Sequence, residues 1–295
     1  MKKIQRTYIP GNDWIYFKLY TGSKTADEFL IRTVSSFVNN LFKNQLIKKW
    51  FFIRYLDPDF HLRIRFMVKD AYNVGIIINL FSKQLNYWID NGLLWKIQID
   101  TYNRELERYG NALIEEAESF FWIDSEAILS IIKKITVYDN AVYRWMICLK
   151  MIDCLLSDFS FNITEKQQLM ENLSHSYKME FGFNDYNSKQ FNTKFRENKS
   201  IIESVLNNTI NDKTFILLYN PIQNRSKRLI PIVESIKKKL KKKNVNLNLS
   251  DLLASYIHMM INRLFRSKNR LHELIIYDFM RRYYTSEISK LKYNQ

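Results

Sequence analysis

Apolar and polar residues alternate with a period of two in four short segments of the first hundred residues, and helical patterns separate them. Segments 50–55, 61–66 and 95–102 each predict a strand. Segments 26–42 and 73–89 repeat apolar residues at spacings of three and four, which predicts helices. The first strand, predicted over 13–20, is expected to be half-buried, with its two faces formed by Ile15, Phe17, Leu19 and by Tyr16, Lys18, Tyr20.

The resulting order, β-α-β-β-α-β, is typical of a ferredoxin-like arrangement. Beyond residue 111 the pattern of apolar residues is almost entirely helical. The short apolar run 215–219 also fits an extended segment, and Asn220 and Pro221 predict a loop. We therefore expect an α+β fold, in which a ferredoxin-like first half (1–111) packs against a helical second half (112–295) within a single domain, 1–295. The predicted helices of the second half are 112–121, 125–135, 138–157, 164–181, 188–208, 226–243, 250–265 and 270–287.

Composition narrows the class of protein. With 6 Gly and 4 Pro, the chain favours long elements, and it contains neither a P-loop nor a dinucleotide-binding fingerprint. Two cysteines exclude a disulfide framework, which favours the cytoplasm, and no apolar run is long enough to span a membrane. The four histidines lack metal-ligand spacing, so we expect no metal. No organic cofactor motif appears either, so we expect no cofactor. The net charge of +15 indicates either an anionic partner or, as we favour for most lysines, solvated surfaces.

The segment HLRIRF is the first candidate for chemistry. Its alternation places His61, Arg63 and Arg65 on one face of a strand and the apolar residues between them on the other, toward the predicted helices. A strand face with two arginines and a histidine either binds an anion or is simply solvated, and the pattern leaves both interpretations open.

Two further segments carry candidate groups. Arg104 and Arg108 are four residues apart, so they share one face of a helical turn, although Glu105 and Glu107 could equally pair with them on the surface. For segment 255–265 and its flanking residues, a helical projection puts the polar residues in one stripe opposite an apolar face, and a solvated stripe is the simpler interpretation. That stripe contains Asp251, Ser255, His258, Asn262 and Arg266.

These segments together resemble a known family. WFFIRYLDPDFHLRIRF (50–66), TYNRELERYG (101–110) and SYIHMMINRLF (255–265) look like three signature segments of thiopeptide-type bacteriocin biosynthesis proteins. That family is similar to the C-terminal glutamate-elimination domain of class I lantibiotic dehydratases. The resemblance spans about residues 12–287. One departure is Asn111, which stands where the family often has a second glycine.

The resemblance implies a lyase that acts as the stand-alone elimination module of a split peptide dehydratase. Such a module removes glutamate from O-glutamyl-Ser/Thr of a ribosomally made precursor peptide and leaves dehydroalanine or dehydrobutyrine. It implies His258 as general acid or base, arginines that hold glutamate and stabilise charge, and no settled identity for the base. The implied catalytic residues are His258, Arg63, Arg65 and Arg104, and the implied substrate-binding residues are Arg108, Arg54, His61 and Asn262.

The resemblance also implies partners: the precursor peptide and a separate glutamylating dehydratase subunit, with a cyclase and a homodimer left open. Two other functions stay open as well. One is a pyridine-forming cyclase of the same family, which acts on dehydroalanines. The other is a non-catalytic leader-peptide or RNA-binding module, motivated by the basic run 236–243, although such a binder needs no histidine–arginine set and RNA-binding signatures are absent.

Overall fold

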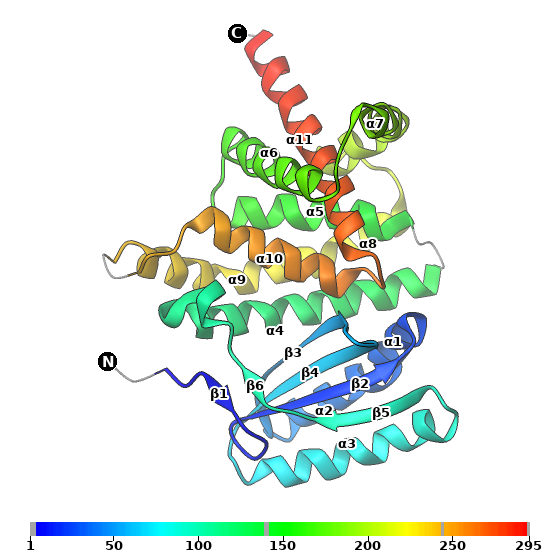
Figure 1. Cartoon of the computed structure of the whole chain (residues 1–295), viewed down its shortest axis with the longest axis vertical. Helices are drawn as coiled ribbons and strands as arrows, with labels where there is room; N and C mark the ends of the chain where they lie inside the picture. The colour runs from blue at the N-terminus through cyan, green and yellow to red at the C-terminus, as the bar shows by residue number, and fades with distance from the viewer. Residues whose placement is uncertain (1–3, 139–141, 243–244, 294–295) are drawn as a thin grey trace. The chain divides into compact units, whose positions relative to one another are not determined.

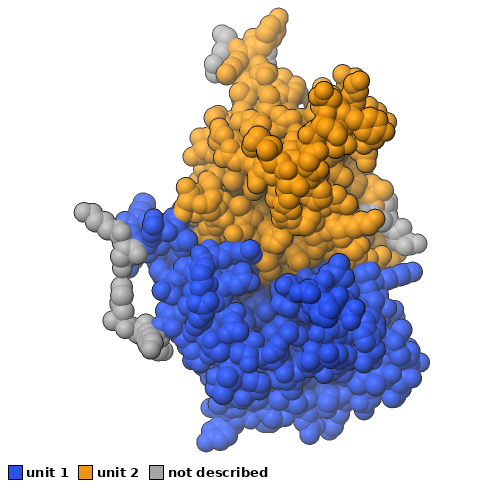
Figure 2. Space-filling view, in the orientation of Figure 1, with its two compact units in different colours: residues 1–133, 234–247 blue, residues 134–233, 248–295 orange. Residues whose placement is uncertain are grey.

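The computed structural model describes residues 4–138, 142–242 and 245–293, and it has an α+β architecture (Figure 1). Two of the predicted helices, 138–157 and 226–243, include positions outside the described residues, namely 139–141 and Lys243. The chain divides into two compact units (Figure 2). The first unit comprises Met1–Lys133 and Glu234–Leu247, and the second comprises Lys134–Val233 and Asn248–Gln295. The first unit therefore extends beyond residue 111, where the sequence suggested a boundary.

A four-stranded antiparallel sheet forms the centre of the first unit, in the order β3-β4-β2-β5. All four predicted strands are confirmed, and they are β2 (Trp14–Thr21), β3 (Ile47–Leu56), β4 (Phe60–Val68) and β5 (Leu94–Ile99). A short second ladder, which the sequence did not predict, pairs β1 (Thr7–Tyr8) with β6 (Tyr102–Asn103).

Helices cover one face of this sheet, as the alternation predicted. The first connection is α1 (Ser23–Phe29), a π-helical turn η1 (Leu30–Val34) and α2 (Ser35–Lys43), and the second is α3 (Asn73–Asp90). Aromatic rings fill the space between the layers: Phe66 of β4 lies 5.9 Å from Phe37 of α2 and 5.8 Å from Phe81 of α3, measured between ring centroids. Such edge-to-face pairs stabilise a core beyond the area that they bury.

The opposite face of the sheet is also covered, in part by α4 (Leu106–Tyr138). The ring of Phe121 on α4 lies 5.5 Å from that of Phe51 on β3. The prediction of a half-buried first strand was therefore wrong, because Tyr16 and Tyr20 on the polar side of β2 are buried as completely as its apolar side. The phenol rings make this possible, since each buries a large apolar body, and the Tyr20 hydroxyl also finds a partner in Gln98.

The beginning of α4 and its middle differ from the sequence-based expectation. Gly110 adopts φ 69° and ψ 152°, a non-helical conformation that glycine accepts without steric cost, so α4 is kinked there and consists of two helical segments. The predicted helices 112–121 and 125–135 form one uninterrupted helix. Ser125 lies inside this helix and is buried, and its Oγ accepts a hydrogen bond from the backbone N–H of Phe52 at 3.3 Å.

The second unit is helical. The stretch 215–219, for which an extended segment was considered, contains the end of α8, a turn at Leu218 and the first residue of α9. Asn220 and Pro221, which were expected in a loop, lie in α9. Pro221 is tolerated because it stands in the first turn of its helix, where a backbone N–H has no intrahelical acceptor. The elements are α5 (Val142–Asp158), α6 (Ile163–Glu180), α7 (Asp185–Leu206), α8 (Lys213–Leu217), α9 (Tyr219–Leu240, which ends in the first unit), α10 (Leu249–Leu264) and α11 (Asn269–Tyr293).

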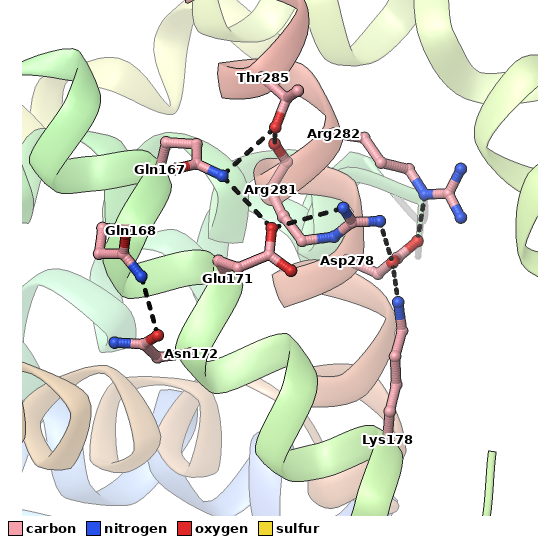
Figure 3. A network of polar contacts seen from close by, with 9 residues as sticks. All are labelled: Gln167, Gln168, Glu171, Asn172, Lys178, Asp278, Arg281, Arg282 and Thr285. Carbon is pink, nitrogen blue, oxygen red and sulfur yellow. Dashed lines mark hydrogen bonds and ion pairs between the residues drawn. The ribbon is translucent and has the colours of Figure 1, made fainter.

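A buried carboxylate joins α6 to α11 within this unit. Asp278 of α11 is fully buried and pairs with Lys178 of α6 and with Arg281 and Arg282 of its own helix (Figure 3). Burial alone would raise the pKa of Asp278, but the hydrogen bond from Lys178 and the nearby Arg282 together hold that pKa below its ordinary value. A carboxylate satisfied by three cations is stable in the interior, whereas an unpaired one would be costly.

Candidate active site

The three polar residues of β4 lie side by side on one face of the sheet, as predicted. We call this surface the arginine face. It consists of His61, Arg63 and Arg65 with their cross-strand partners. In the register of the sheet these partners are Tyr20, Lys18 and Tyr16 of β2 and Tyr55, Ile53 and Phe51 of β3.

Arg65 sits in a box of aromatic rings. Its guanidinium carbon lies 4.3 Å from the ring centroid of Tyr16, 5.2 Å from that of Phe51 and 4.7 Å from that of Tyr102. The residue is 7% exposed, and burial lowers the pKa of its guanidinium. Among the described residues it has no ion pair, and its Nε has no hydrogen-bond acceptor. Ring faces attract a cation without neutralising it, so the positive charge remains available to an anion.

Arg63 is held by a neutral base. Its Nε donates to Nε2 of His61 at 3.0 Å, and its guanidinium carbon lies 3.4 Å above the ring centroid of Tyr55. Nδ1 of His61 is 2.8 Å from the carbonyl oxygen of Asp59 and therefore carries the ring hydrogen. Burial is the main cause of the lowered pKa of His61. His61 thus accepts from Arg63 as an uncharged imidazole and adds no positive charge to the arginine face.

Lys18 of the arginine face pairs with an acid. Asp100, which follows β5, forms an ion pair with Lys18, and the hydrogen bond from Lys18 lowers the pKa of that carboxyl. Tyr20 donates from its hydroxyl to Oε1 of Gln98 at 3.0 Å. Repulsion between the cations of this strand face is therefore relieved by ring faces, one neutral histidine and one lysine–aspartate pair, and neither Arg63 nor Arg65 forms an ion pair with a described carboxylate.

Arg104 forms hydrogen bonds and an ion pair within the first unit. Its Nε and Nη2 donate to the two carboxylate oxygens of Glu118 on α4, at 2.7 and 2.6 Å, and its Nη1 donates to the carbonyl oxygen of Gln5 at 3.1 Å. The hydroxyl of Tyr102 donates to the same Glu118 at 3.0 Å. Since the ring of Tyr102 is one wall of the box around Arg65, the order of contacts Arg104–Glu118–Tyr102–Arg65 links the two arginines.

Arg54 and Arg108 lie apart from the arginine face. Arg54 points to the side of the sheet that α1, α2 and α3 cover. There its Nη2 pairs with the Asp27 carboxylate of α1 at 2.6 Å, and both side chains are buried. The side chain of Arg108 is 44% exposed and lies 3.5 Å from the Glu105 carboxylate, an ordinary surface pair. Of the five arginine candidates, only Arg63 and Arg65 therefore share one surface.

A histidine–carboxylate pair lies in the second unit. Nδ1 of His258 on α10 is 2.8 Å from Oε1 of Glu273 on α11, and the hydroxyl of Tyr277 donates to the same oxygen at 3.0 Å. The His258 side chain is 30% exposed, whereas Glu273 is fully buried. A carboxylate at Nδ1 fixes the ring hydrogen there and leaves Nε2 with its lone pair, which is the arrangement that a general base requires.

The sequence did not single out Glu273 or Tyr277. A signal was present: Glu273 occupies the apolar stripe of α11, three and four residues before the buried Ile276 and Tyr277. A carboxylate in such a stripe must have a buried partner. Asn262, predicted to bind substrate, follows His258 by one turn of α10 and is half-buried.

Within the described residues, no cluster of three or more His, Cys, Asp and Glu side chains is arranged to hold a metal ion. No helix in the part of the chain that the structure describes is both long and apolar enough to cross a membrane.

Comparison with known proteins identifies relatives over nearly the whole chain. The profile of the family described as "Lantibiotic biosynthesis dehydratase C-term" matches residues 14–284. The subtilin biosynthesis protein SpaB of Bacillus subtilis is 26% identical over 284 residues, which cover 92% of this chain and 25% of SpaB. The chain thus spans about a quarter of the length of this curated relative.

Two solved structures share the fold. The tRNA-dependent lantibiotic dehydratase MibB from Microbispora sp. 107891 superposes with a TM-score of 0.72 at 19% identity, covering 95% of this chain and 28% of MibB. The pyridine synthase TbtD from thiomuracin biosynthesis superposes with a TM-score of 0.63 at 12% identity, covering 95% of this chain and 100% of TbtD.

Proposed function

Because the chain belongs to the family of lantibiotic biosynthesis dehydratase C-terminal domains, we propose that it eliminates glutamate from O-glutamyl-Ser/Thr residues of a precursor peptide. The observation that carries this proposal is the pair of His258 and Glu273, because it leaves a positioned base at Nε2. The products are dehydroalanine or dehydrobutyrine and free glutamate. The substrate is a peptide whose Ser or Thr has already been esterified by a glutamylating activity.

In the proposed reaction, Nε2 of His258 takes the α-proton of the glutamylated residue. The electron pair of the Cα–H bond forms the Cα=Cβ double bond, the Cβ–O bond breaks, and glutamate leaves as a carboxylate. Glu273 stabilises the imidazolium that results, because its carboxylate is buried beside Nδ1. A positioned base of this kind contributes about 10²–10⁴-fold to the rate.

We assign Arg63 and Arg65 to the anionic groups of the reaction. Negative charge develops on the peptide carbonyl oxygen as the α-proton is removed, and the departing glutamate carries carboxylates. Guanidinium groups suit both, because they offer paired N–H donors in a plane. The uncompensated charge of Arg65 supports this assignment. Arg104 then acts as a positioning residue, through Glu118 and Tyr102, and Arg108 and Asn262 bind peptide from partly exposed positions.

The test is mass spectrometry of a synthetic peptide that carries O-glutamyl-serine, incubated with the purified chain. We expect loss of glutamate and formation of dehydroalanine, and no product with His258→Ala. The matched control is His175→Ala, which removes an exposed histidine of α6. Unchanged peptide with the wild-type chain would reject elimination. A bis-dehydroalanine peptide tests the cyclase alternative, for which a pyridine product is the signature.

We further propose that the sheet unit is ferredoxin-like. The strand order β3-β4-β2-β5, the antiparallel pairing and the helical connections after β2 and β4 support this assignment.

A further inference from the structure

The strand β5 has an edge at which no described strand pairs with it. In the order β3-β4-β2-β5 it is the outermost strand, and β2 is its one strand neighbour among the described residues (Figure 1). The backbone N–H of Asp100 donates to the carbonyl oxygen of Tyr16 at 3.0 Å, so Asp100 faces β2. Because alternate residues of an antiparallel strand face the same neighbour, Gln98 also faces β2, whereas Ile97 and Ile99 direct their backbone N–H and C=O groups outward. Within the described part of the chain, these outward groups have no hydrogen-bond partner.

Most of this edge is unprotected. β5 contains no proline, and its irregularity of register lies before Lys96, so that 96–99 is regular. Lys96 is the charged residue of the strand, and its amine lies 5.0 Å from the ring centroid of Tyr20, over the arginine face and not across the edge. Trp95 is 57% exposed and Ile99 is 38% exposed. An edge with free backbone groups and exposed apolar side chains is the surface to which an extended peptide adds as a further strand.

β5 also continues the arginine face. Gln98 is the register partner of Lys18, and both side chains lie on that face. A strand added beyond β5 would lie about 5 Å from it and would place alternate side chains on the same face, beside Gln98. At β5 this face is open, since Lys96 is exposed, whereas at β3 the ring of Phe121 covers that of Phe51. An extended peptide at this edge therefore presents its side chains to the arginine face from the open side.

We propose that the free edge of β5 binds an extended segment of the precursor peptide as an antiparallel fifth strand, with the glutamylated side chain on the arginine face. The identity of the peptide rests on the proposed function, whereas the pairing of a strand with β5 does not. The peptide residues opposite Ile97 and Ile99 exchange hydrogen bonds with them and point their side chains to the helix-covered side of the sheet. The glutamylated residue lies between these two, so its own N–H points away from β5. A second copy of the chain is the competing occupant, and a net charge of +15 on each copy disfavours it.

The test uses two isomeric peptides, each with one O-glutamyl-serine preceded by two alanines and with one N-methyl group. In the first isomer the methyl group is on the alanine next to the serine, whose N–H faces β5. Its KM should be about tenfold higher than that of the unmethylated peptide, because a hydrogen bond is lost and the methyl group separates the strands. In the second isomer the methyl group is one alanine further away and points outward, so KM should stay within about twofold.

Amide hydrogen exchange of the full chain gives a readout that does not depend on turnover. The unmethylated peptide should slow exchange at Ile97 and Ile99 and leave Gln98, which already faces β2, unchanged. Ile97→Pro removes an outward N–H, which an edge strand tolerates, and should raise KM about tenfold, with Ile97→Val as the matched control. If Ile97→Pro does not fold, the two isomers still test the proposal on the wild-type chain.

Equal or reversed KM values for the two isomers would overturn the proposal and leave elimination itself intact. Protection of Ile97 and Ile99 that grows with protein concentration in the absence of peptide would also overturn it, because the occupant would then be a second copy. If the wild-type chain does not eliminate glutamate, the proposed function fails, and hydrogen exchange with the same peptide still tests the pairing of a strand with β5.

Discussion

Nε of Arg63 donates a hydrogen bond to Nε2 of His61 over 3.0 Å. This hydrogen bond of the arginine face requires that Nε2 of His61 stays unprotonated. A protonated His61 would have no acceptor to offer and would place a second cation against the first. The pairing therefore ties the geometry of a candidate catalytic arginine to the charge of its neighbour two residues away on β4.

The first prediction concerns the pH dependence of stability. The pKa of His61 is lowered in the folded chain, whereas in the unfolded chain it is about 6.5. The unfolded chain therefore binds the proton more readily, and the free energy of unfolding should fall as the pH decreases through about 6.5, until it levels off below the folded pKa. Urea unfolding should show a smaller fall for His61→Gln, and an NMR titration of the His61 ring at or above the ordinary pKa would contradict this account.

The second prediction separates function from stability at Arg65. Its buried guanidinium lacks a carboxylate partner in the described structure, so Arg65→Met should leave the melting temperature unchanged or raise it. Elimination should nevertheless fall by about 10²-fold or more, because a fixed cation aimed at developing charge is lost. Thermal unfolding and peptide turnover measured on the same sample test both halves. A large loss of stability would show that Arg65 is mainly structural.

The third prediction is the opposite case, Arg104. Arg104→Met leaves Glu118 buried without its bidentate partner and should cost about 3–5 kcal/mol of the free energy of unfolding. The double variant Arg104→Met/Glu118→Leu should recover much of that loss, because no charge then remains buried. Urea unfolding measures the free energy of unfolding of the two variants and tests this expectation. If Arg104→Met kept full stability and lost only turnover, Arg104 would act on the substrate directly.

The fourth prediction concerns Glu273. Glu273→Gln keeps the size of the side chain but removes the charge beside Nδ1 of His258. Turnover should fall by about 10²–10⁴-fold, as expected when a base loses the group that fixes its tautomer. The Michaelis constant should stay unchanged, since Glu273 is fully buried and does not reach the substrate. Glu197→Gln, an exposed carboxylate of α7, is the control, and equal turnover of both variants would remove Glu273 from the mechanism.

The fifth prediction uses two glycines. A Cβ at Gly110 would lie 2.6 Å from Cδ1 of Leu247, and its φ is 69°, so Gly110→Ala should destabilise the chain by about 1–3 kcal/mol. Gly75, in the helix α3, has open space around its Cα, and Gly75→Ala should be neutral or stabilise by up to about 1 kcal/mol. Chemical denaturation measures both changes, and equal effects would contradict the conformational argument.

The sequence predicted what is local. The alternation in HLRIRF correctly placed His61, Arg63 and Arg65 on one face, because successive side chains of a strand point to opposite sides. The helices with long apolar stripes were predicted correctly because residues three and four apart share one face of a helix. The stretch 215–219 was ambiguous, since a short apolar run fits a strand and a buried helix equally well.

The pattern of apolar and polar residues could not predict contacts between segments that are distant in the sequence. The helical spacing of Arg104 and Arg108 suggested a shared face, but Arg104 precedes α4 and pairs with Glu118, fourteen residues later in the chain. Glu273 pairs with a histidine on another helix, which a helical projection of either segment cannot reveal. Cover over the arginine face was equally hidden, because it depends on contacts between α4 and β3 such as Phe121 with Phe51 and Ser119 with Lys49.

The path of the chain has a consequence for how this protein is made. The first unit is discontinuous: residues 234–247 return to it after the chain has built much of the second unit. Within it, Ser235 and Lys239 bind Glu116 of α4, and Leu247 packs against Gly110. A fragment that stops at residue 133 lacks all of these contacts. During translation, the first unit therefore cannot complete its packing until residue 247 has left the ribosome, long after the sheet has been synthesised.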